Sequence, residues 1–337
     1  MSDAVRSAVG KLANGGSPSP DEIGASFHAI LSGEAEPALI AAFLMGLRMK
    51  GETVEDIVAG VKVMRATMRG ANAPVGAIDT CGTGGLSWTS LNTSTAVSLV
   101  AAGAGIVVAK HGNRSKSRAG SADVLEALGV NLSPSDAQIE ASFRDAGVAF
   151  MFAQQHHTAM KHVAPVRQAL GMRTIFNMLG PLANPAGVKR QVMGVFAPEW
   201  VEPVAKAMLS LGSERAMVVH GLDGMDEIST TGATLVAEIR DGAVHVYEVT
   251  PEQLGVARAN IESLRGGSVA ENAEALKRVL GGESSAFADL VAVNAGAAIM
   301  VAGLTDTIAD GIAKARASIS SGKATGALEA LRRASNG

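Results

Sequence analysis

The 337-residue chain is poor in cysteine and in aromatic residues, and it has no long apolar run. Its one cysteine, Cys81, excludes an intramolecular disulfide framework and a zinc cluster built from cysteines. Aromatic residues make up only 3% of the chain, so a core must consist of Ala, Val, Leu, Ile and Met. Because a run of about 18 apolar residues and a signal-peptide pattern are both missing, we expect a cytoplasmic protein without a membrane partner.

An excess of positive charge is missing as well. Lys and Arg number 29 against 32 Asp and Glu, which gives a formal net charge of −3. This balance gives no overall electrostatic reason to bind nucleic acid, and we expect no such partner. The composition is that of a globular protein, with 47% hydrophobic and 18% charged residues. Since 337 residues exceed the usual size of one core, we expect one large or two unequal domains.

Residues 1–70 carry only helix patterns. Ser19-Pro20 and Pro37 are typical helix starts, and Thr53 opens a third helix that runs to Gly70. The apolar stripe on the second of these helices is wide for a small bundle, and part of it could be buried by a partner subunit or by plain core packing. Residues 71–76 are expected to be a linker.

Beyond residue 105 the pattern is that of an α/β protein, with strands alternating with helices. Residues 172–187 contain Gly180-Pro181 and Asn184-Pro185. The segment is too broken for a regular helix or strand, and we interpret it as a hinge or cover segment. Asp241-Gly242 predicts a hairpin turn. The pattern predicts strands at 106–109, 148–152, 191–195 and 216–220, and helices at 157–170, at 198–211 and from about 270 onward.

The most informative stretch begins after an apolar segment that ends at Ile78. Three glycines in Gly82-Thr83-Gly84-Gly85 permit positive φ angles and close backbone approach, so that successive N–H groups could converge on an anion. A helix over 94–105 follows, and Asn92-Thr93-Ser94-Thr95 would place amide and hydroxyl groups at its positive end. This order is typical of a strand, a glycine loop and a helix.

A second loop follows the strand predicted at 106–109. Lys110, Arg114, Lys116 and Arg118 fall within nine residues and would form a cationic wall for a polyanion. A glycine-rich turn alone is more often a tight connection, and a basic run alone is usually a solvated face. Both loops, however, follow predicted strands of one sheet and would open on its carboxyl edge, where such folds bind ligands. We interpret them as a phosphate or pyrophosphate cradle that follows neither the Walker nor the dinucleotide pattern.

Other chemically suggestive residues have plainer explanations. The adjacent carboxylates Asp226-Glu227 follow a predicted strand and suit Mg²⁺, although two acids in a turn are usually just solvated. Arg167 could hold a carboxylate with its planar fork or form a surface salt bridge. His156, His157 and His162 lack the usual spacing of helical metal ligands, so they are expected to be structural or to line substrate. Cys81 fits a small buried residue better than a nucleophile.

At these residues the chain resembles the anthranilate phosphoribosyltransferase family of tryptophan biosynthesis. Matching stretches run over residues 34–229 and include the segment 157–184 around Arg167. The resemblance implies an α/β fold: a small N-terminal all-helical domain and a larger α/β domain with a central, mainly parallel sheet, as in nucleoside phosphorylases. It implies domains at 1–72, joined by a hinge segment at 168–187, and at 73–337. It also implies a homodimer formed through the helical domain. The motifs that carry it are Gly82-Thr83-Gly84-Gly85, Asn92-Thr93-Ser94-Thr95, Lys110-His111-Gly112-Asn113-Arg114 and Gly120-Ser121-Ala122-Asp123.

The activity implied by the resemblance is that of a pentosyltransferase. The phosphoribosyl group of phosphoribosyl pyrophosphate (PRPP) passes to anthranilate and gives N-(5-phosphoribosyl)anthranilate and pyrophosphate. The family uses Mg²⁺, and we expect two ions in each active site. The aromatic amine is already neutral at pH 7, and no residue is assigned as a general acid or base.

The site residues are likewise implied by the resemblance. Expected metal ligands are Ser94, Asp226 and Glu227. Expected acceptor-binding residues are Gly82, Asn113, Arg167, Gly180 and Pro181, with Asn177 in the same hinge segment. Expected donor-binding residues are Gly82, Gly85, Ser90, Asn92, Thr93, Ser94, Thr95, Lys110, His111, Gly112, Asn113, Arg114, Ser117 and Ser121.

The chain departs from the family pattern at two places. Leu86-Ser87 stands where the family usually has Asp-Gly, and the loop between Arg114 and Gly120 is one residue short, with Lys116 where small residues are usual. Two other functions stay open: a pyrimidine nucleoside phosphorylase, which shares the architecture, and a non-catalytic relative that binds nucleic acid. Arg167 and the Asp226-Glu227 pair favour the anthranilate enzyme over a nucleoside phosphorylase. The negative net charge disfavours a protein that binds nucleic acid.

Overall fold

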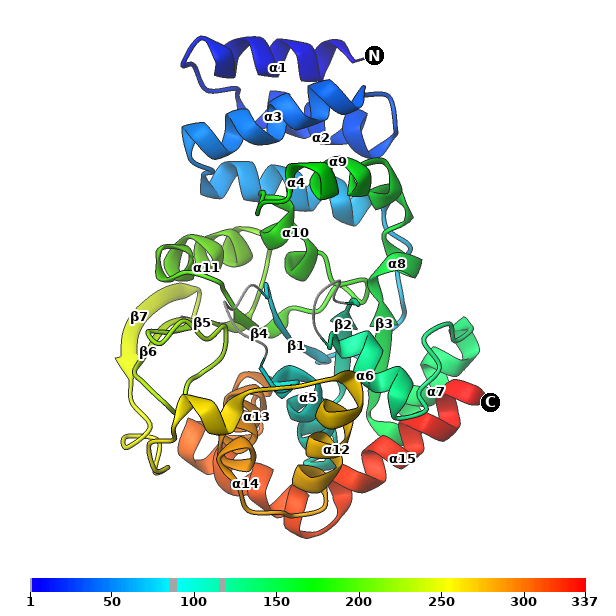
Figure 1. The fold of residues 1–337 in the computed structure, drawn as a ribbon, viewed down its shortest axis with the longest axis vertical. Helices are drawn as coiled ribbons and strands as arrows, with labels where there is room; N and C mark the ends of the chain where they lie inside the picture. Colours follow the sequence, from blue (N-terminus) through cyan, green and yellow to red (C-terminus); the bar gives the residue numbers. More distant parts are fainter. Residues whose placement is uncertain (1, 85–89, 115–118) are drawn as a thin grey trace.

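The computed structural model describes residues 2–84, 90–114 and 119–337. The molecule is elongated, with a layer of helices at one end and a sheet flanked by helices at the other (Figure 1). The two chain ends lie far apart, because the N-terminus is in the helical layer and the C-terminal helix packs against α7 (Asp136–Ala146). Within the described part of the chain, no helix combines the length and the apolar character needed to cross a membrane.

Four helices form the N-terminal part of the helical layer. They are α1 (Asp3–Ala13), α2 (Pro20–Leu31), α3 (Pro37–Lys50) and α4 (Val54–Thr67). Ser19 and Thr53 each form a capping box with the acidic residue three positions on, which satisfies orphan N–H groups and fixes the start of α2 and α4. The three helix starts predicted from the sequence are therefore confirmed.

A segment from the middle of the chain completes this layer. It contains α8 (Ala153–His156), the 3₁₀ helix η1 (Thr158–His162), α9 (Ala164–Leu170) and α10 (Phe176–Leu182). Here η1 packs on α2, α9 on α3, and α10 on α4. The predicted single helix at 157–170 is wrong, because the chain forms the separate 3₁₀ helix η1 and then starts α9 at Ala164, with Pro165 in the first turn, where its missing N–H is tolerated.

The expectation that residues 172–187 hold no regular element is also wrong. Gly180 and Pro181 lie inside α10, whose apolar side chains are buried against α4. A Cβ at Gly60 of α4 would lie 2.7 Å from Leu179 Cδ1, so the two helices approach closely at this glycine. Tertiary packing thus outweighs the helix-breaking tendency of the Gly-Pro step.

The sheet has seven strands in the order β3-β2-β1-β4-β5-β6-β7. The pairs from β3 to β5 are parallel, and β6 and β7 add an antiparallel hairpin, so the predicted mainly parallel sheet is confirmed. At the hairpin turn, Asp241 and Gly242 have φ angles of 52° and 75°, as the sequence predicts. The strands are β1 (Ile78–Gly82), β2 (Val108–Gly112), β3 (Val148–Phe152), β4 (Arg190–Gly194), β5 (Arg215–Gly221), β6 (Thr234–Arg240) and β7 (Ala243–Val249).

Two strands differ from their predicted positions by more than one residue. The apolar segment was expected to end at Ile78, yet β1 begins there and runs through polar residues to Gly82. The strand predicted at 106–109 lies at 108–112, so Lys110 and His111 belong to β2 and not to a loop. Both errors arise because buried polar side chains with distant partners continue these strands beyond their apolar residues.

Each face of the sheet has its own helices and apolar core. One core contains residues of the helices α5 (Thr93–Gly103), α12 (Val269–Leu280) and α13 (Ala286–Ala302). The other core contains residues of α11 (Val201–Ser210), α10 and the N-terminal helices, and it continues without interruption from α1 to β6. The remaining helices are α6 (Ser121–Ala127), α14 (Ile308–Ser320), α15 (Lys323–Asn336), η2 (Pro198–Trp200) and η3 (Ile261–Leu264).

Candidate active site

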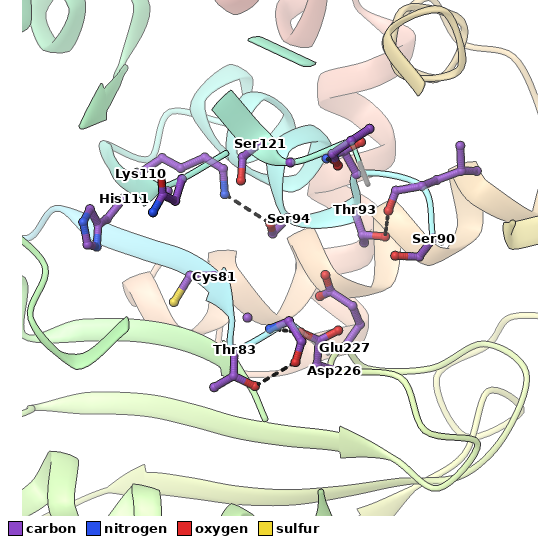
Figure 2. Close-up of a pocket in the computed structure, with 18 of the residues that line it drawn as sticks. Cys81, Thr83, Ser90, Thr93, Ser94, Lys110, His111, Ser121, Asp226 and Glu227 are labelled. Carbon is purple, nitrogen blue, oxygen red and sulfur yellow. Dashed lines mark hydrogen bonds between the residues drawn. The ribbon is translucent and has the colours of Figure 1, made fainter. Parts of the chain in front are cut away.

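A cavity of about 380 Å³ opens where the strand order reverses. β1 has β2 on one side and β4 on the other, and the cavity lies beyond the carboxyl ends of these strands. This is where open α/β sheets bind ligands. The loop after β1, the start of α5, the end of β2 and the loop after β5 all line it (Figure 2). The sequence prediction that the two loops open on the same edge is confirmed.

In the described part of the glycine run, the backbone N–H groups of Thr83 and Gly84 form hydrogen bonds within the protein. The Thr83 N–H donates to the Gly194 carbonyl at 2.9 Å, and the Gly84 N–H donates to Asp226 Oδ2 at 2.8 Å. The expectation that these N–H groups converge on an anion is therefore not met at these two residues. Gly85 lies outside the described residues.

Glycines beside Asp226 keep the carboxylate loop close to the sheet. A Cβ on Gly194 would overlap the Asp226 backbone, and one on Gly82 would collide with the Asp226 side chain. The absence of side chains at the ends of β1 and β4 thus lets Asp226 approach the glycine run.

The N-terminus of α5 faces the cavity, as the sequence predicts. Asn92 is the N-cap residue, and Thr93 and Ser94 form the first turn. The Asn92 side chain donates to the Ala119 carbonyl at 3.0 Å and accepts from Asn272 Nδ2 at 2.9 Å. This places an oriented amide and the positive end of a helix dipole at the cavity wall, an arrangement that favours an anion.

Lys110 is a buried cation beneath the cavity. Its side chain is only 1% exposed, and Nζ donates to the Thr80 carbonyl at 2.8 Å and to Ser94 Oγ at 3.2 Å (Figure 2). Burial lowers the pKa of Lys110, while Asp79, Cys81 and Glu227 act in the opposite direction. These two bonds use two of the three ammonium donors.

The second cation of the predicted wall is not free. Arg114 donates to both carboxylate oxygens of Glu126 at 2.8 Å and to Asp123 at 2.9 Å, and these hydrogen bonds raise its pKa. Lys116 and Arg118 lie outside the described residues. The predicted wall of loop cations therefore needs correction: Lys110 lies in a strand, and Arg114 forms ion pairs with two carboxylates of α6.

Asp226 and Glu227 lie side by side at the cavity, on the loop after β5 (Figure 2). Burial raises the pKa of Asp226, and the hydrogen bond from Gly84 opposes this. Burial and then the neighbouring Asp226 raise the pKa of Glu227 well above its usual value. Asn294 of α13 holds the next residue of the loop, since its side chain accepts from the Ile228 N–H at 2.9 Å and donates to the Ile228 carbonyl at 2.9 Å.

Three histidines gather beside the end of β2. The rings of His111 and His157 are 5.0 Å apart, both residues are buried, and Nε2 of each has no hydrogen-bond partner among the described residues. Burial lowers the pKa of His111 well below its usual value and that of His157 to about 4. His156 Nδ1 lies 2.8 Å from the Arg69 carbonyl. No group of three or more metal-ligating side chains occurs within residues 2–84, 90–114 and 119–337.

The expected acceptor residues lie partly outside the cavity wall. Arg167 on α9 contacts Asn177 Oδ1 at 3.4 Å and lies over the Phe176 ring, and burial lowers its pKa. No carboxylate among the described residues pairs with its guanidinium, in contrast to the surface salt bridge considered from the sequence. Gly180 and Pro181 follow on α10, and the Pro181 carbonyl accepts from Gln191 Nε2 at 2.9 Å.

Most of the residues expected to bind PRPP or the metal line this cavity. Thr95 does not line it: this residue is fully buried in α5, and its hydroxyl has no partner among the described residues. Ser117 lies outside the described part, as does Leu86-Ser87. The expected residues that line the cavity are Gly82, Ser90, Asn92, Thr93, Ser94, Lys110, His111, Gly112, Asn113, Arg114, Ser121, Asp226 and Glu227.

No individual site role was predicted for several residues at or below the cavity. Cys81, Thr83 and Leu91 line it. Burial and then Asp79 raise the pKa of the Cys81 thiol, so this cysteine is not an activated nucleophile. The buried polar residues Asp79 and Gln191 lie beneath the cavity. Gln191 begins the strand predicted at 191–195, whereas Asp79 follows the apolar segment that was expected to end at Ile78.

Comparison with known proteins agrees with this architecture. Residues 75–325 match the glycosyl transferase family, a/b domain, and residues 6–68 match the glycosyl transferase family, helical bundle domain. The anthranilate phosphoribosyltransferase of Parvibaculum lavamentivorans is 53% identical over 333 residues, which cover 98% of each chain. That of Azorhizobium caulinodans is 50% identical and covers 98% of this chain and 97% of its own.

Solved structures give the same result. The anthranilate phosphoribosyltransferase of Thermus thermophilus superposes with a TM-score of 0.92 at 42% identity, covering 98% of this chain and 99% of its own. The Saccharomyces cerevisiae enzyme in complex with PRPP and Mg has a TM-score of 0.91 at 26% identity, covering 100% and 99%. Since these similarities extend over both predicted parts of the sequence, the chain belongs to the anthranilate phosphoribosyltransferase family.

Proposed function

We propose that the cavity at the β1–β4 switch point binds PRPP, and that its phosphoribosyl group is transferred there to anthranilate. The observation that carries this proposal is the convergence of a helix N-terminus, a buried lysine and two adjacent carboxylates on one cavity. The yeast relatives crystallised with PRPP and Mg and with 4-fluoroanthranilate support the same pair of substrates.

Binding of the donor would use groups that already point to the cavity. The start of α5 and the oriented Asn92 amide would receive the negative charge of the diphosphate. Lys110 would stabilise the charge that grows on the leaving pyrophosphate, and because it is held by Thr80 and Ser94 it would need little reorganisation during the reaction. Arg114 would contribute most fully after it exchanges its carboxylate partners Glu126 and Asp123 for the donor.

The carboxylate pair fits Mg²⁺. Asp226, Glu227 and the Ser94 hydroxyl offer the hard oxygen ligands that Mg²⁺ prefers, and a bound cation would offset the burial and the Asp226 repulsion that raise the pKa of Glu227. We propose two ions per site, with donor oxygens supplying the remaining ligands. When bound, Mg²⁺ neutralises charge on the diphosphate.

The acceptor would approach from the α9–α10 side. We propose that Arg167 holds the anthranilate carboxylate, and its guanidinium is suited to this because no protein carboxylate in the described residues occupies it. Gly180 and Pro181 would line the path to the anomeric carbon. The neutral amine attacks this carbon as pyrophosphate leaves, so catalysis relies on positioning and on leaving-group stabilisation.

One assay tests this function. The purified protein is incubated with anthranilate, PRPP and Mg²⁺, and the disappearance of anthranilate fluorescence is followed with time. The expected result is a loss of anthranilate fluorescence that requires PRPP and is accompanied by release of pyrophosphate. A protein that instead cleaves a pyrimidine nucleoside in the presence of phosphate, and leaves anthranilate unchanged, would contradict the proposal.

We also propose the larger organisation of the protein. Domains at 1–72 and 73–337, with 168–187 joining the helical domain, agree with the two matched family ranges. A cytoplasmic homodimer would form through the helical domain, where Met49 is 80% exposed beside a groove of about 640 Å³ between α1 and α3. Light scattering coupled to size-exclusion chromatography would give twice the chain mass, and a Met49→Asp variant would shift the mass to that of one chain.

A further inference from the structure

Asp79 is a fully buried carboxylate on β1 to which the proposed mechanism gives no role. Its Oδ1 accepts a hydrogen bond from the His111 backbone N–H at 3.3 Å, and its Oδ2 accepts one from Gln191 Nε2 at 3.3 Å. The Asn184 side chain lies nearby and acts to lower the pKa of Asp79. Both hydrogen-bond partners are donors, so the position calls for a group that only accepts, which is an ionised carboxylate.

The surroundings explain how a charge is kept at this position. Burial raises the pKa of Asp79, whereas the positive charge of Lys110 and the donors around it act in the opposite direction. Lys110 lies on the next strand, paired through the register Ile78–Val108, and no ion pair joins the two side chains. The carboxylate thus depends on the nearby charge of Lys110 and on its hydrogen-bond donors to remain ionised.

The side chains of Gln191 and Asn184 connect different parts of the site. Besides Asp79, Gln191 Nε2 contacts the Pro181 carbonyl at 2.9 Å and Cys81 Sγ at 3.1 Å. Asn184 Nδ2 donates to the Ala109 carbonyl on β2 at 2.9 Å. Asp79 therefore lies where β1, β2 and β4 meet the α10 segment.

The Gln191 amide explains why a carboxylate is needed. An NH₂ group has two hydrogens, so Gln191 gives one to Pro181 and shares the other between Asp79 and Cys81. The anionic acceptor at Asp79 selects this orientation of the amide. An amide at position 79 could present its NH₂ group to Gln191. The Gln191 side chain would then turn its oxygen toward that NH₂ group and toward the Pro181 carbonyl, and the contact between the two oxygens would be repulsive.

We propose that Asp79 is a positioning residue that, through Gln191, fixes Pro181 and hence the acceptor side of the site relative to the donor-binding strands. This inference rests on the proposed role of Gly180 and Pro181 in the acceptor path. It assigns Asp79 no contact with substrate.

A double-mutant cycle tests the inference. The cycle comprises the wild type, Asp79→Asn, Gln191→Met and the double variant, and kcat and both KM values are measured for each. Gln253→Met, at an exposed position after β7, is the matched control for the Gln-to-Met exchange. Thermal unfolding shows that each protein is folded at the assay temperature.

We expect each single variant to raise the anthranilate KM by about 2- to 12-fold, the effect of losing one ordinary hydrogen bond, and to change the donor KM less. The double variant should be no worse than the more affected single variant, because both changes interrupt the same connection. Effects that multiply, or a donor KM that rises more than the anthranilate KM, would overturn the inference.

Two further measurements separate the possible failures. A wild-type protein without anthranilate turnover would overturn the proposed function, whereas turnover with multiplying effects would overturn only the role of Asp79. If Asp79→Asn does not fold, Gln191→Met alone decides: it must raise the anthranilate KM while the donor KM stays within about twofold. An unchanged anthranilate KM in this variant would refute the connection.

Discussion

His157→Gln is expected to make the stability of this protein less sensitive to acid. The imidazole is 7% exposed, lies 5.0 Å from the His111 ring, and has an Nε2 atom with no hydrogen-bond partner among the described residues. Burial and then the neighbouring His156 lower the pKa of His157 to about 4 from a usual value of 6.5. A glutamine keeps a polar side chain at this position without taking up a proton.

The sign and size of the effect follow from proton linkage. The folded-state pKa lies below that of the unfolded chain, so between pH 6.5 and about 4 the unfolded chain binds a proton that the folded protein does not. Stability is complete above pH 6.5 and is lost as the pH falls through this window. Between pH 7 and about pH 4.5, His157 alone accounts for roughly 2 kcal/mol of the loss in unfolding free energy.

Urea unfolding at both pH values, followed by far-UV circular dichroism, measures this effect. The wild type should lose roughly 2 kcal/mol more than His157→Gln between pH 7 and about pH 4.5. His28→Gln, at an exposed position on α2, is the control and should behave as the wild type. If the unfolding free energies of wild type and His157→Gln fell in parallel, the buried neutral imidazole would be refuted as a source of acid sensitivity.

Three other predictions concern the active site. Asp226→Asn with Glu227→Gln should preserve the fold but lower kcat/KM by roughly 100-fold or more, since several kcal/mol of charge stabilisation would be lost; near-normal turnover at limiting Mg²⁺ would contradict the metal assignment. Arg167→Ala should raise the anthranilate KM by about 10- to 150-fold, the value of one charge-assisted contact, with little change in the donor KM. Equal changes in both KM values would indicate a structural role. Leu86→Asp with Ser87→Gly should tighten PRPP binding at low Mg²⁺ and leave anthranilate affinity unchanged, because a leucine offers no polar contact. Titration of PRPP at several Mg²⁺ concentrations measures this effect. Unaltered PRPP affinity would show that this loop is not impaired.

The sequence predicted the general layout of the site because parallel strands share one carboxyl edge. The glycine run, the helix start at Asn92 and the pair Asp226-Glu227 each follow a strand, and each lines the same cavity. These features depend on local chemistry, such as glycine conformations and helix capping, which a single sequence contains.

The polar interior beneath the site could not be predicted in this way. Lys110 is stable inside β2 because of the Thr80 carbonyl and the Ser94 hydroxyl, which are 30 and 16 residues away in the chain. Asp79 depends in the same way on Gln191, which is 112 residues away. Apolar periodicity records neither partner, so the strands were ended too early.

Tertiary packing likewise concealed α10. Its Gly-Pro step is typical of a loop, and the helix is supported by packing against α4, where Leu179 fits at Gly60. Arg65 of α4 adds hydrogen bonds from Nε and Nη2 to the Leu182 carbonyl, at 3.1 and 2.9 Å, where α10 ends. Contacts between residues more than one hundred positions apart are not visible in a local pattern.

The helical layer is formed by two segments that lie far apart in the sequence. This arrangement limits how recombination between genes could exchange the layer. Residues 1–72 supply α1 to α4, but Val163, Val166 and Phe176 complete their apolar core from the middle of the chain. A gene fragment ending near residue 72 would therefore encode helices with an uncovered apolar surface. The remaining fragment would carry the complementary uncovered surface on α9 and α10. The helical end is not a transferable module, and recombination could exchange it only together with a piece of the α/β part.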